Sequence, residues 1–388
     1  MITIFVALKH INGRKRQSIV AISSVVIAMV VLVVSIGIAS GLDKQMIKSM
    51  LSIMPDIKVY NSTMNIKDYN GLSDKIIKIK GVKGVIPQYS TQGIIKFEGN
   101  TGNFVSGIMI KGIDQKNANN ALELNKELIK GTYNFNKLNT IVVGKELFKE
   151  LGAKLGDVVK IISPENKALY LKITGIFYTG YYDYDSKFIF IPLKTAQILS
   201  DSGNIVTNLN VKLKDVYQAK KISKEIEKKT GYMTSTWGEL NKNILYALSL
   251  EKTVMILVLS LIVFVSGFVL AVVLNTTVKE KTRDIGIMRA IGFSKSKIMR
   301  IFMLEGLIIG AIGIIIGTCL SFLILGFLEK YSLHFLIKAY YLTKIPVEVT
   351  LKDYFGVLIE IIIIIIIFTF VPAYRASKLY PVEALKYE

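Results

Sequence analysis

The chain has 388 residues, 51% of them hydrophobic, and a formal net charge of +20. Its mean hydropathy of +0.45 exceeds that of an average soluble protein, so a membrane protein is the leading class. The positive charge is lysine spread along the chain, without a basic stripe or recognition motif, which argues against nucleic-acid binding. Two histidines are too few for a His-based zinc site, so ordinary surface roles are expected for His10 and His334.

Four apolar segments are long enough to cross a bilayer. The first, Ile19 to Ser40, carries no charge and would span roughly 33 Å as a helix. The others are 253–278, then 301–328, broken only by Glu305, and 354–374, broken only by Glu360. A cleavable signal peptide is the alternative for the first, but its apolar run exceeds the usual length, so an uncleaved anchor is predicted.

Positive charge near the short loops predicts the orientation. Lys9, Arg14, Lys15 and Arg16 precede the first span, and the loop 279–300 is strongly basic. Because such loops stay in the cytoplasm, both termini and this loop are expected there, in a multi-pass protein of the cytoplasmic (inner) membrane.

The segment 42–250 is far too long for a loop and must fold as a domain. Runs such as IKVY, TIVVG, VVKII and KFIFIPL predict strands, and 66–80 and 216–229 have helical spacing. The predicted fold class is therefore four transmembrane helices plus a large α+β extracytoplasmic domain. Two β-α-β halves, 56–114 and 204–236, would flank a β-rich insertion, 115–203.

Catalytic and metal sites are not predicted. The domain 42–250 has no histidine or cysteine, and the chain lacks the Gly-rich loop that holds ATP, as well as hydrolase, metalloprotease and dinucleotide motifs. The cluster TGYYDYD, 179–185, could contact a ligand, but an exposed hairpin tip is the expected structure. Glu305 and Glu360 should face a bundle interior or an interface, in packing roles rather than a proton relay.

A short amphipathic helix is predicted in the basic loop. Ile287, Met288 and Ile291 share an arc of about 100°, flanked by cations. This pattern suits docking into a groove on another protein; an interfacial helix on anionic lipid is the alternative.

A stripe of small residues is predicted in the third span. Gly306, Gly310, Gly313 and Gly317 recur at spacings of 4, 3 and 4 and line one helix face. Such a stripe lets helices approach closely, within the subunit or across a dimer.

At these residues the chain resembles a known family. TRDIGIMRAIGFSKSKIMRIFMLEGLIIGAIGIIIG and the terminal VPAYRASKLYPVEALKYE are similar to ABC transporter permeases of the MacB, LolC/LolE and FtsX superfamily. WGELNKNILYALSLEKTVMILVLSLIVFVSGF and MLSIMPDIKV resemble most the lipoprotein-releasing LolC/LolE branch. The order of one span, a large domain and three more spans is also that of the family.

The resemblance implies a non-catalytic permease without a cofactor of its own, because ATP and magnesium bind a separate LolD-like ABC ATPase. It implies a second permease copy or paralogue, and a ferredoxin-like part interrupted by the β-rich insertion. Lipoprotein release from the membrane is the expected function. The ATPase-coupling residues it implies are Arg283, Asp284, Ile287, Met288, Arg289, Ile291 and Gly292.

One departure concerns the periplasmic carrier. LolC-type proteins recruit it with a protruding hook, and the corresponding segment, 161–177, is too short for one. The resemblance implies a periplasmic carrier as a partner, whereas this short segment argues against one. Two other functions stay open: MacB-like export of a small molecule or peptide, and FtsX-like mechanotransmission that regulates a cell-wall hydrolase. A membrane receptor without an ATPase would leave the basic loop unexplained.

The expected organisation follows from these assignments. It comprises a cytoplasmic N-terminus with the first span (1–41), the extracytoplasmic domain (42–250), the second span (251–278), the cytoplasmic coupling loop (279–300), the third span (301–328), an extracytoplasmic loop (329–353), the fourth span (354–374) and a cytoplasmic tail (375–388).

Overall fold

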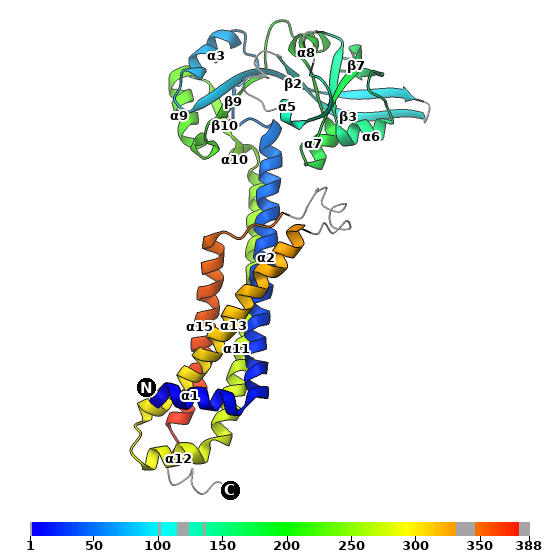
Figure 1. Ribbon diagram of the computed structural model, residues 1–388. Coiled ribbons are helices and arrows are strands. Elements are labelled where there is room, and N and C mark those ends of the chain that lie inside the picture. The colour runs from blue at the N-terminus through cyan, green and yellow to red at the C-terminus, as the bar shows by residue number, and fades with distance from the viewer. Residues whose placement is uncertain are drawn as a thin grey trace. The chain divides into compact units, whose positions relative to one another are not determined.

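A computed structural model describes residues 2–99, 102–114, 124–133, 135, 137–330 and 346–379. The chain divides into two compact units: a helical unit, residues 1–43 with 247–388, and an α/β unit, residues 44–246. Figure 1 shows the helices and strands of both.

The α/β unit contains a ferredoxin-like part. Its strands pair in the antiparallel order β10-β1-β9-β2, and α3 and α9 supply the helical half of the core that covers one face. The elements are β1 (Ile57–Tyr60), α3 (Tyr69–Ile77), β2 (Val82–Gly99), β9 (Asn208–Leu213), η1 (Val216–Gln218), α9 (Ala219–Thr230) and β10 (Met233–Thr236). Both helices come from the segments where helical spacing was predicted.

Five of the remaining strands close with β2 into a barrel. Around the ring, β2 pairs with β3, β3 with β8, β8 with β5, β5 with β7, β7 with β6, and β6 returns to β2. All six strands contribute to one buried apolar cluster, so side chains fill the interior. The elements are β3 (Gly102–Ile113), α5 (Leu124–Glu127), β4 (Leu128–Gly131), β5 (Thr140–Gly144), α6 (Lys145–Leu151), β6 (Val158–Ile162), β7 (Ala168–Phe177), α7 (Tyr182–Lys187), β8 (Phe188–Pro192) and α8 (Leu193–Leu199).

The long strand β2 belongs to both parts. Its first residues pair with β9 in the ferredoxin-like sheet, and its later residues, Ile94 to Lys96, pair with β6 in the barrel. The barrel thus draws β2 and β3 from the segment 56–114, and one continuous strand joins it to the ferredoxin-like part (Figure 1).

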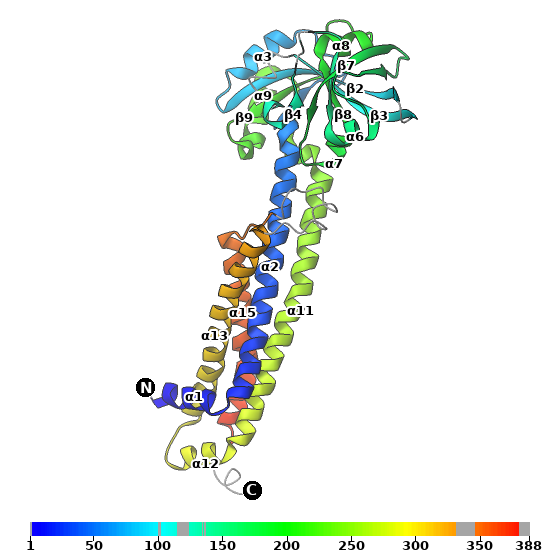
Figure 2. The ribbon, with the colours of Figure 1, turned by 45° about the vertical axis from the view of Figure 1, so that its right-hand side comes forward.

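The helical unit confirms the four predicted spans. In the part of the chain that the structure describes, four helices are long and apolar enough to cross a membrane: α2 (Lys15–Ile53), α11 (Lys242–Glu280), α13 (Lys295–Lys330) and α15 (Leu351–Ser377). Two shorter helices, α1 (Ile2–Gly13) and α12 (Thr282–Ala290), lie at one end of the bundle (Figure 2). At 1.5 Å per residue, the 39 residues of α2 and of α11 extend about 58 Å, well beyond a hydrocarbon core of about 30 Å.

The four long helices share one apolar core. Leu32 of α2, Leu270 of α11, Ile309 of α13 and Ile361 of α15 are all buried in it. Large apolar side chains cover the outside of the bundle too, which suits a surface that faces lipid.

The glycine stripe of α13 packs against two neighbouring helices of the same chain. A Cβ at Gly306 would collide with Thr369, and one at Gly310 would lie 2.6 Å from Ile365, both on α15. On the other part of the stripe, a Cβ at Gly313 would lie 2.7 Å from Val25 of α2. A Cβ at Gly317 would lie 2.7 Å from Met29, also on α2. The stripe therefore sets the close approach of α13 to α2 and α15.

Adding one methyl group to this stripe is expected to destabilise the bundle. Gly313→Ala and Gly317→Ala should each cost about 1–3 kcal/mol, because no real Cβ tolerates a 2.7 Å neighbour and the helices must separate. Gly326→Ala is the matched control on the same helix, since its Cβ would meet nothing within 4 Å. Thermal unfolding in detergent, followed by circular dichroism, measures the difference. Equal melting midpoints for Gly313→Ala and Gly326→Ala would contradict this packing.

Candidate functional site

The predicted coupling helix is α12, which follows α11 directly. Ile285 is fully buried and Met288 is half-buried against it, in a cluster formed with the ends of α11, α13 and α15. Arg289 turns back on the helix end, where its guanidinium donates to the Phe293 carbonyl at 3.0 Å. Gly292 ends the turn with φ of +100°, a conformation that favours glycine. One side of α12 is thus fixed to the bundle.

The opposite side of α12 carries exposed apolar side chains. Ile287 is 47% exposed, and Ile291, the residue that caps the end of the helix, is 71% exposed. Arg283 and Asp284 flank them on the same helix face and are exposed as well, with Asp284 bound to Lys281 at 2.6 Å. Of the three apolar residues predicted to share the docking face, Met288 packs inward and the two isoleucines face outward.

The helix α1 is fastened to α13 by a buried polar contact. His10 Nδ1 lies 3.3 Å from Glu305 Oε2. The centroid of the imidazole ring is 5.9 Å from the centroid of the Phe302 phenyl ring. The helix α1 lies across the end of the bundle (Figures 1 and 2). The surface role expected for His10 is wrong, because its imidazole contacts Glu305 of α13 and is largely buried. Glu305 faces the interior as predicted, and Glu360 is half-buried. His334 lies outside the described residues.

A buried joint, formed by Asp56, Leu51, Lys212, Leu213 and Trp237, ties the end of α2 to the sheet of the α/β unit. The Asp56 carboxylate accepts from the Leu213 N–H at 2.8 Å and from the Lys212 ammonium at 3.0 Å. Lys212 also donates to the Leu51 carbonyl in the last turn of α2, at 2.7 Å. This bond satisfies one of the carbonyls that a helix end leaves free.

The same joint holds the segment that leads into α11. The Trp237 N–H donates to the Asp56 carbonyl at 2.9 Å, and β1 pairs with β10 beside it. Trp237 begins the short helix α10 (Trp237–Leu240), which a capping box of Thr236 and Glu239 starts. That hydrogen bonding keeps the pKa of Glu239 below its usual value. The end of α2 therefore leads into β1, and β10 leads through α10 into α11. These two strands are neighbours in the sheet.

A polar row crosses the sheet face opposite α3 and α9. Asn208, Asn210 and Gln88 are buried and hydrogen-bonded in series, with both side-chain contacts at 2.6 Å. Gln88 and Lys111 both donate to the Ser90 hydroxyl. Burial, with a smaller contribution from the Lys58 charge, lowers the pKa of Lys111 to about 8.

The cluster 179–185 is not the exposed hairpin tip that was expected. Its second half begins α7, and Asp185 is fully buried. The Asp185 carboxylate accepts from the N–H and hydroxyl of Thr179, both at 2.9 Å, and Tyr184 stacks on Phe188. The Asp185 carboxylate therefore stabilises the turn before α7 by accepting hydrogen bonds from Thr179. Residue type alone does not reveal this role.

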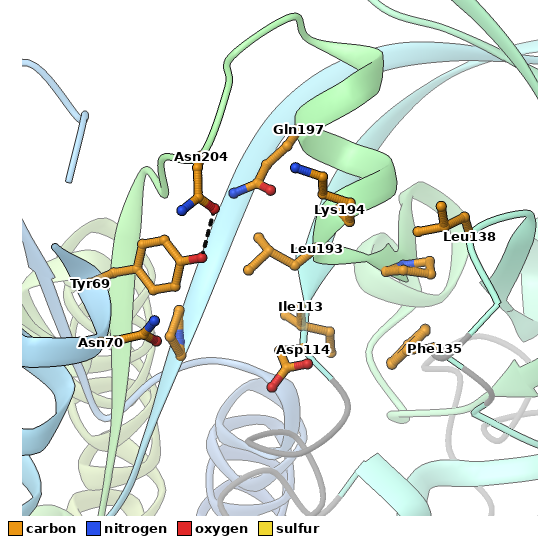
Figure 3. Close-up of a pocket in the computed structure, with 12 residues that line it drawn as sticks. Tyr69, Asn70, Ile113, Asp114, Phe135, Leu138, Leu193, Lys194, Gln197 and Asn204 are labelled. Carbon is orange, nitrogen blue, oxygen red and sulfur yellow. Dashed lines mark hydrogen bonds between the residues drawn. The ribbon is translucent and has the colours of Figure 1, made fainter. Parts of the chain in front are cut away.

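A pocket of about 310 Å³ lies between the ferredoxin-like part and the barrel (Figure 3). Tyr69 donates to Asn204 at 2.9 Å on one wall, and Leu193 of α8 faces them across it. Lys194 and Asp114 are its charged lining residues. Among the described residues, no group of three or more His, Cys, Asp or Glu side chains could hold a metal ion.

The sequence matches two families, one in the α/β unit with the first span and one in the last three spans. Residues 18–229 match the MacB-like periplasmic core domain, and residues 256–381 match the FtsX-like permease C-terminal family. The chain belongs to the FtsX/MacB permease superfamily. This permease is therefore a non-catalytic transmembrane subunit, and membership implies a partner ABC ATPase.

Several named proteins are similar to the permease. The lipoprotein-releasing system transmembrane protein LolC of Buchnera aphidicola subsp. Schizaphis graminum is 29% identical over 412 residues, covering 100% of this chain and 99% of that protein. LolE of Haemophilus influenzae is 24% identical over 420 residues, covering 98% of each. The periplasmic region of MacB from Actinobacillus actinomycetemcomitans is 16% identical with a TM-score of 0.35, covering 48% of this chain and 91% of that structure.

Removing the central carboxylate should loosen the joint. Asp56→Ala removes the ion-pair partner of Lys212 and leaves the buried Leu213 N–H without its acceptor, which is expected to cost about 3 kcal/mol. Trp237 is the single tryptophan of the chain and lies at the joint, so its fluorescence in a denaturant titration reports the loss. Glu225→Ala removes a carboxylate from an exposed pair with Lys229 and should cost no more than about 0.5 kcal/mol. Similar midpoints for the two variants would show that the joint contributes little.

Proposed function

We propose that this permease couples ATP hydrolysis by a separate ATPase to motion of the α/β unit, and that it releases lipoproteins from the cytoplasmic membrane. The observation that carries the coupling is the split of α12 into a fixed and a free side. Ile285 and Met288 anchor the helix to the bundle, while Ile287 and Ile291 stay exposed beside charged neighbours. An exposed apolar pair with a polar rim is typical of a docking surface for another protein.

Lipoprotein release is supported by the full-length relatives. Chains named as lipoprotein-releasing LolC and LolE match essentially the entire sequence, at 24–29% identity. The partners would be a LolD-like ATPase, which binds ATP and magnesium, and a second permease copy or paralogue. The turn between β6 and β7 bears on the carrier: the Ser163 N–H donates to the Lys167 carbonyl at 2.9 Å, so this hairpin is closed by a tight turn. We propose that the permease works without a carrier-recruiting hook there.

The orientation is part of the proposal. Both termini and α12 would be cytoplasmic and the α/β unit extracytoplasmic, as the basic residues around α1 and α12 indicate. With Cys319 replaced by serine, a membrane-impermeant thiol reagent should label Lys130→Cys in spheroplasts and label Lys297→Cys only after the membrane is opened. The reverse pattern would refute the orientation.

The docking face of α12 can be tested by charge insertion. Replacing Ile287 and Ile291 with Asp should lower recovery of the co-purifying ATPase by more than about tenfold, because an apolar groove cannot solvate the carboxylates. Yield and melting midpoint of the permease should be unchanged, since both side chains are exposed. Ser296→Asp with Lys297→Asp is the control, two exposed positions of the same connector. Normal ATPase recovery with the isoleucine variant would remove α12 from the interface.

A further inference from the structure

A basic cavity lies between α1 and the corner where α11 turns into α12. Its volume is about 630 Å³, and both helices contribute to its walls. Lys9, His10 and Arg14 come from the N-terminal side of the chain, and Lys281 and Asp284 from the other. All of them belong to the helical unit.

One cationic side chain of the cavity is not balanced by a carboxylate of the described residues. Arg14 is paired with Glu280, and Lys281 with Asp284 at 2.6 Å. His10 is turned towards Glu305 of α13. Among the described residues, Lys9 has no ion-pair partner. The cavity therefore suits a ligand with one negative charge, which could share the donors of Lys9, Arg14 and Lys281.

The outer face of α1 places this cavity at the membrane surface. Ile4, Phe5 and Leu8 are 48%, 67% and 49% exposed and fall on one arc of about 100°. Ala7, on the inner side, is fully buried. A helix with an exposed apolar arc that lies across the end of a transmembrane bundle is expected at the boundary between headgroups and acyl chains (Figure 2). Lys9 borders that arc, so the cavity opens at headgroup depth.

From the cavity, its charge and its depth, we propose that it binds the phosphodiester headgroup of an anionic phospholipid. Lys9 and Lys281 reach the phosphate from opposite walls, and the acyl chains lie along the exposed face of α1. Basic cavities beside cytoplasmic helix ends suit anionic headgroups because each nearby cation adds to the attraction. The bound headgroup bridges α1 and the start of α12, so it braces the helix that carries Ile287 and Ile291.

The test uses the purified full-length chain in a neutral detergent and three soluble probes. These are short-chain phosphatidylglycerol, short-chain phosphatidylcholine and inorganic phosphate, and native mass spectrometry counts bound molecules. Phosphatidylglycerol should bind at one saturable site and raise the melting midpoint, and phosphatidylcholine should not. Phosphate binding as tightly as phosphatidylglycerol would overturn the lipid assignment in favour of a free anion.

Variants locate the site. Lys9→Gln and Lys281→Gln should each weaken phosphatidylglycerol binding by about fivefold, the loss expected for one cation near the headgroup. Lys279→Gln makes the same charge change two residues from Lys281 but outside the cavity, and should bind normally. Lys9→Arg should retain binding. Equal affinity for the Lys9→Gln and Lys279→Gln variants would overturn the proposal. The proposal would also be overturned if Lys9→Gln lowered recovery of the co-purifying ATPase while phosphatidylglycerol binding stayed unchanged.

Discussion

The hydrogen bonds of Asp56 are the interaction on which the proposed mechanism depends. Its N–H, carbonyl and carboxylate all have partners, and these partners come from β9 and from the start of α10. Through Lys212 the same residue is linked to the last turn of α2. Because the Asp56 carboxylate is buried and its hydrogen bonds join several elements, a displacement of either helix end must move the sheet or break several bonds at once. A single buried carboxylate therefore makes two helix ends and one sheet act together.

The helical bundle is closely packed, and α12 offers an exposed surface to a partner. Glycines of α13 bring it against α2 and α15 at distances that leave no room for a Cβ, which resists sliding between the helices. The helix α12 is fixed to this bundle by Ile285, while its outer isoleucines are free to meet a partner. A push on α12 thus acts on a closely packed bundle, and α2 and α11 each continue unbroken for 39 residues. In the proposed mechanism, motion of a separate ATPase would pass from α12 to this bundle and along the continuous helices α2 and α11.

Local patterns, such as uncharged or alternating runs, could be read from the sequence. Pairings between residues far apart in the chain could not. Uncharged runs predicted the four spans because burial in lipid requires them, and alternating runs predicted strands such as 140–144 and 188–192. The return of β6 to β2, which closes the barrel, depends on residues far apart in the chain, and no local pattern encodes it. Asp56 and Lys212 were missed for the same reason, although MPDIKV lay within a stretch that resembled the family. His10 and Asp185 were assigned to the surface because a lone polar residue gives no sign of its partner.

Distance measurement across the two units tests force transmission most directly. Fluorophores are placed at Glu165, in the exposed β6–β7 turn, and at Lys297, beside α12, in a permease with Cys319 replaced by serine. The permease is reconstituted with its co-purifying ATPase in nanodiscs, and single-molecule energy transfer is recorded with ATP and with ADP. We expect ATP to shift the distribution of transfer efficiencies and ADP to restore it. An unchanged distribution while the complex hydrolyses ATP would show that the α/β unit does not move with the ATPase cycle.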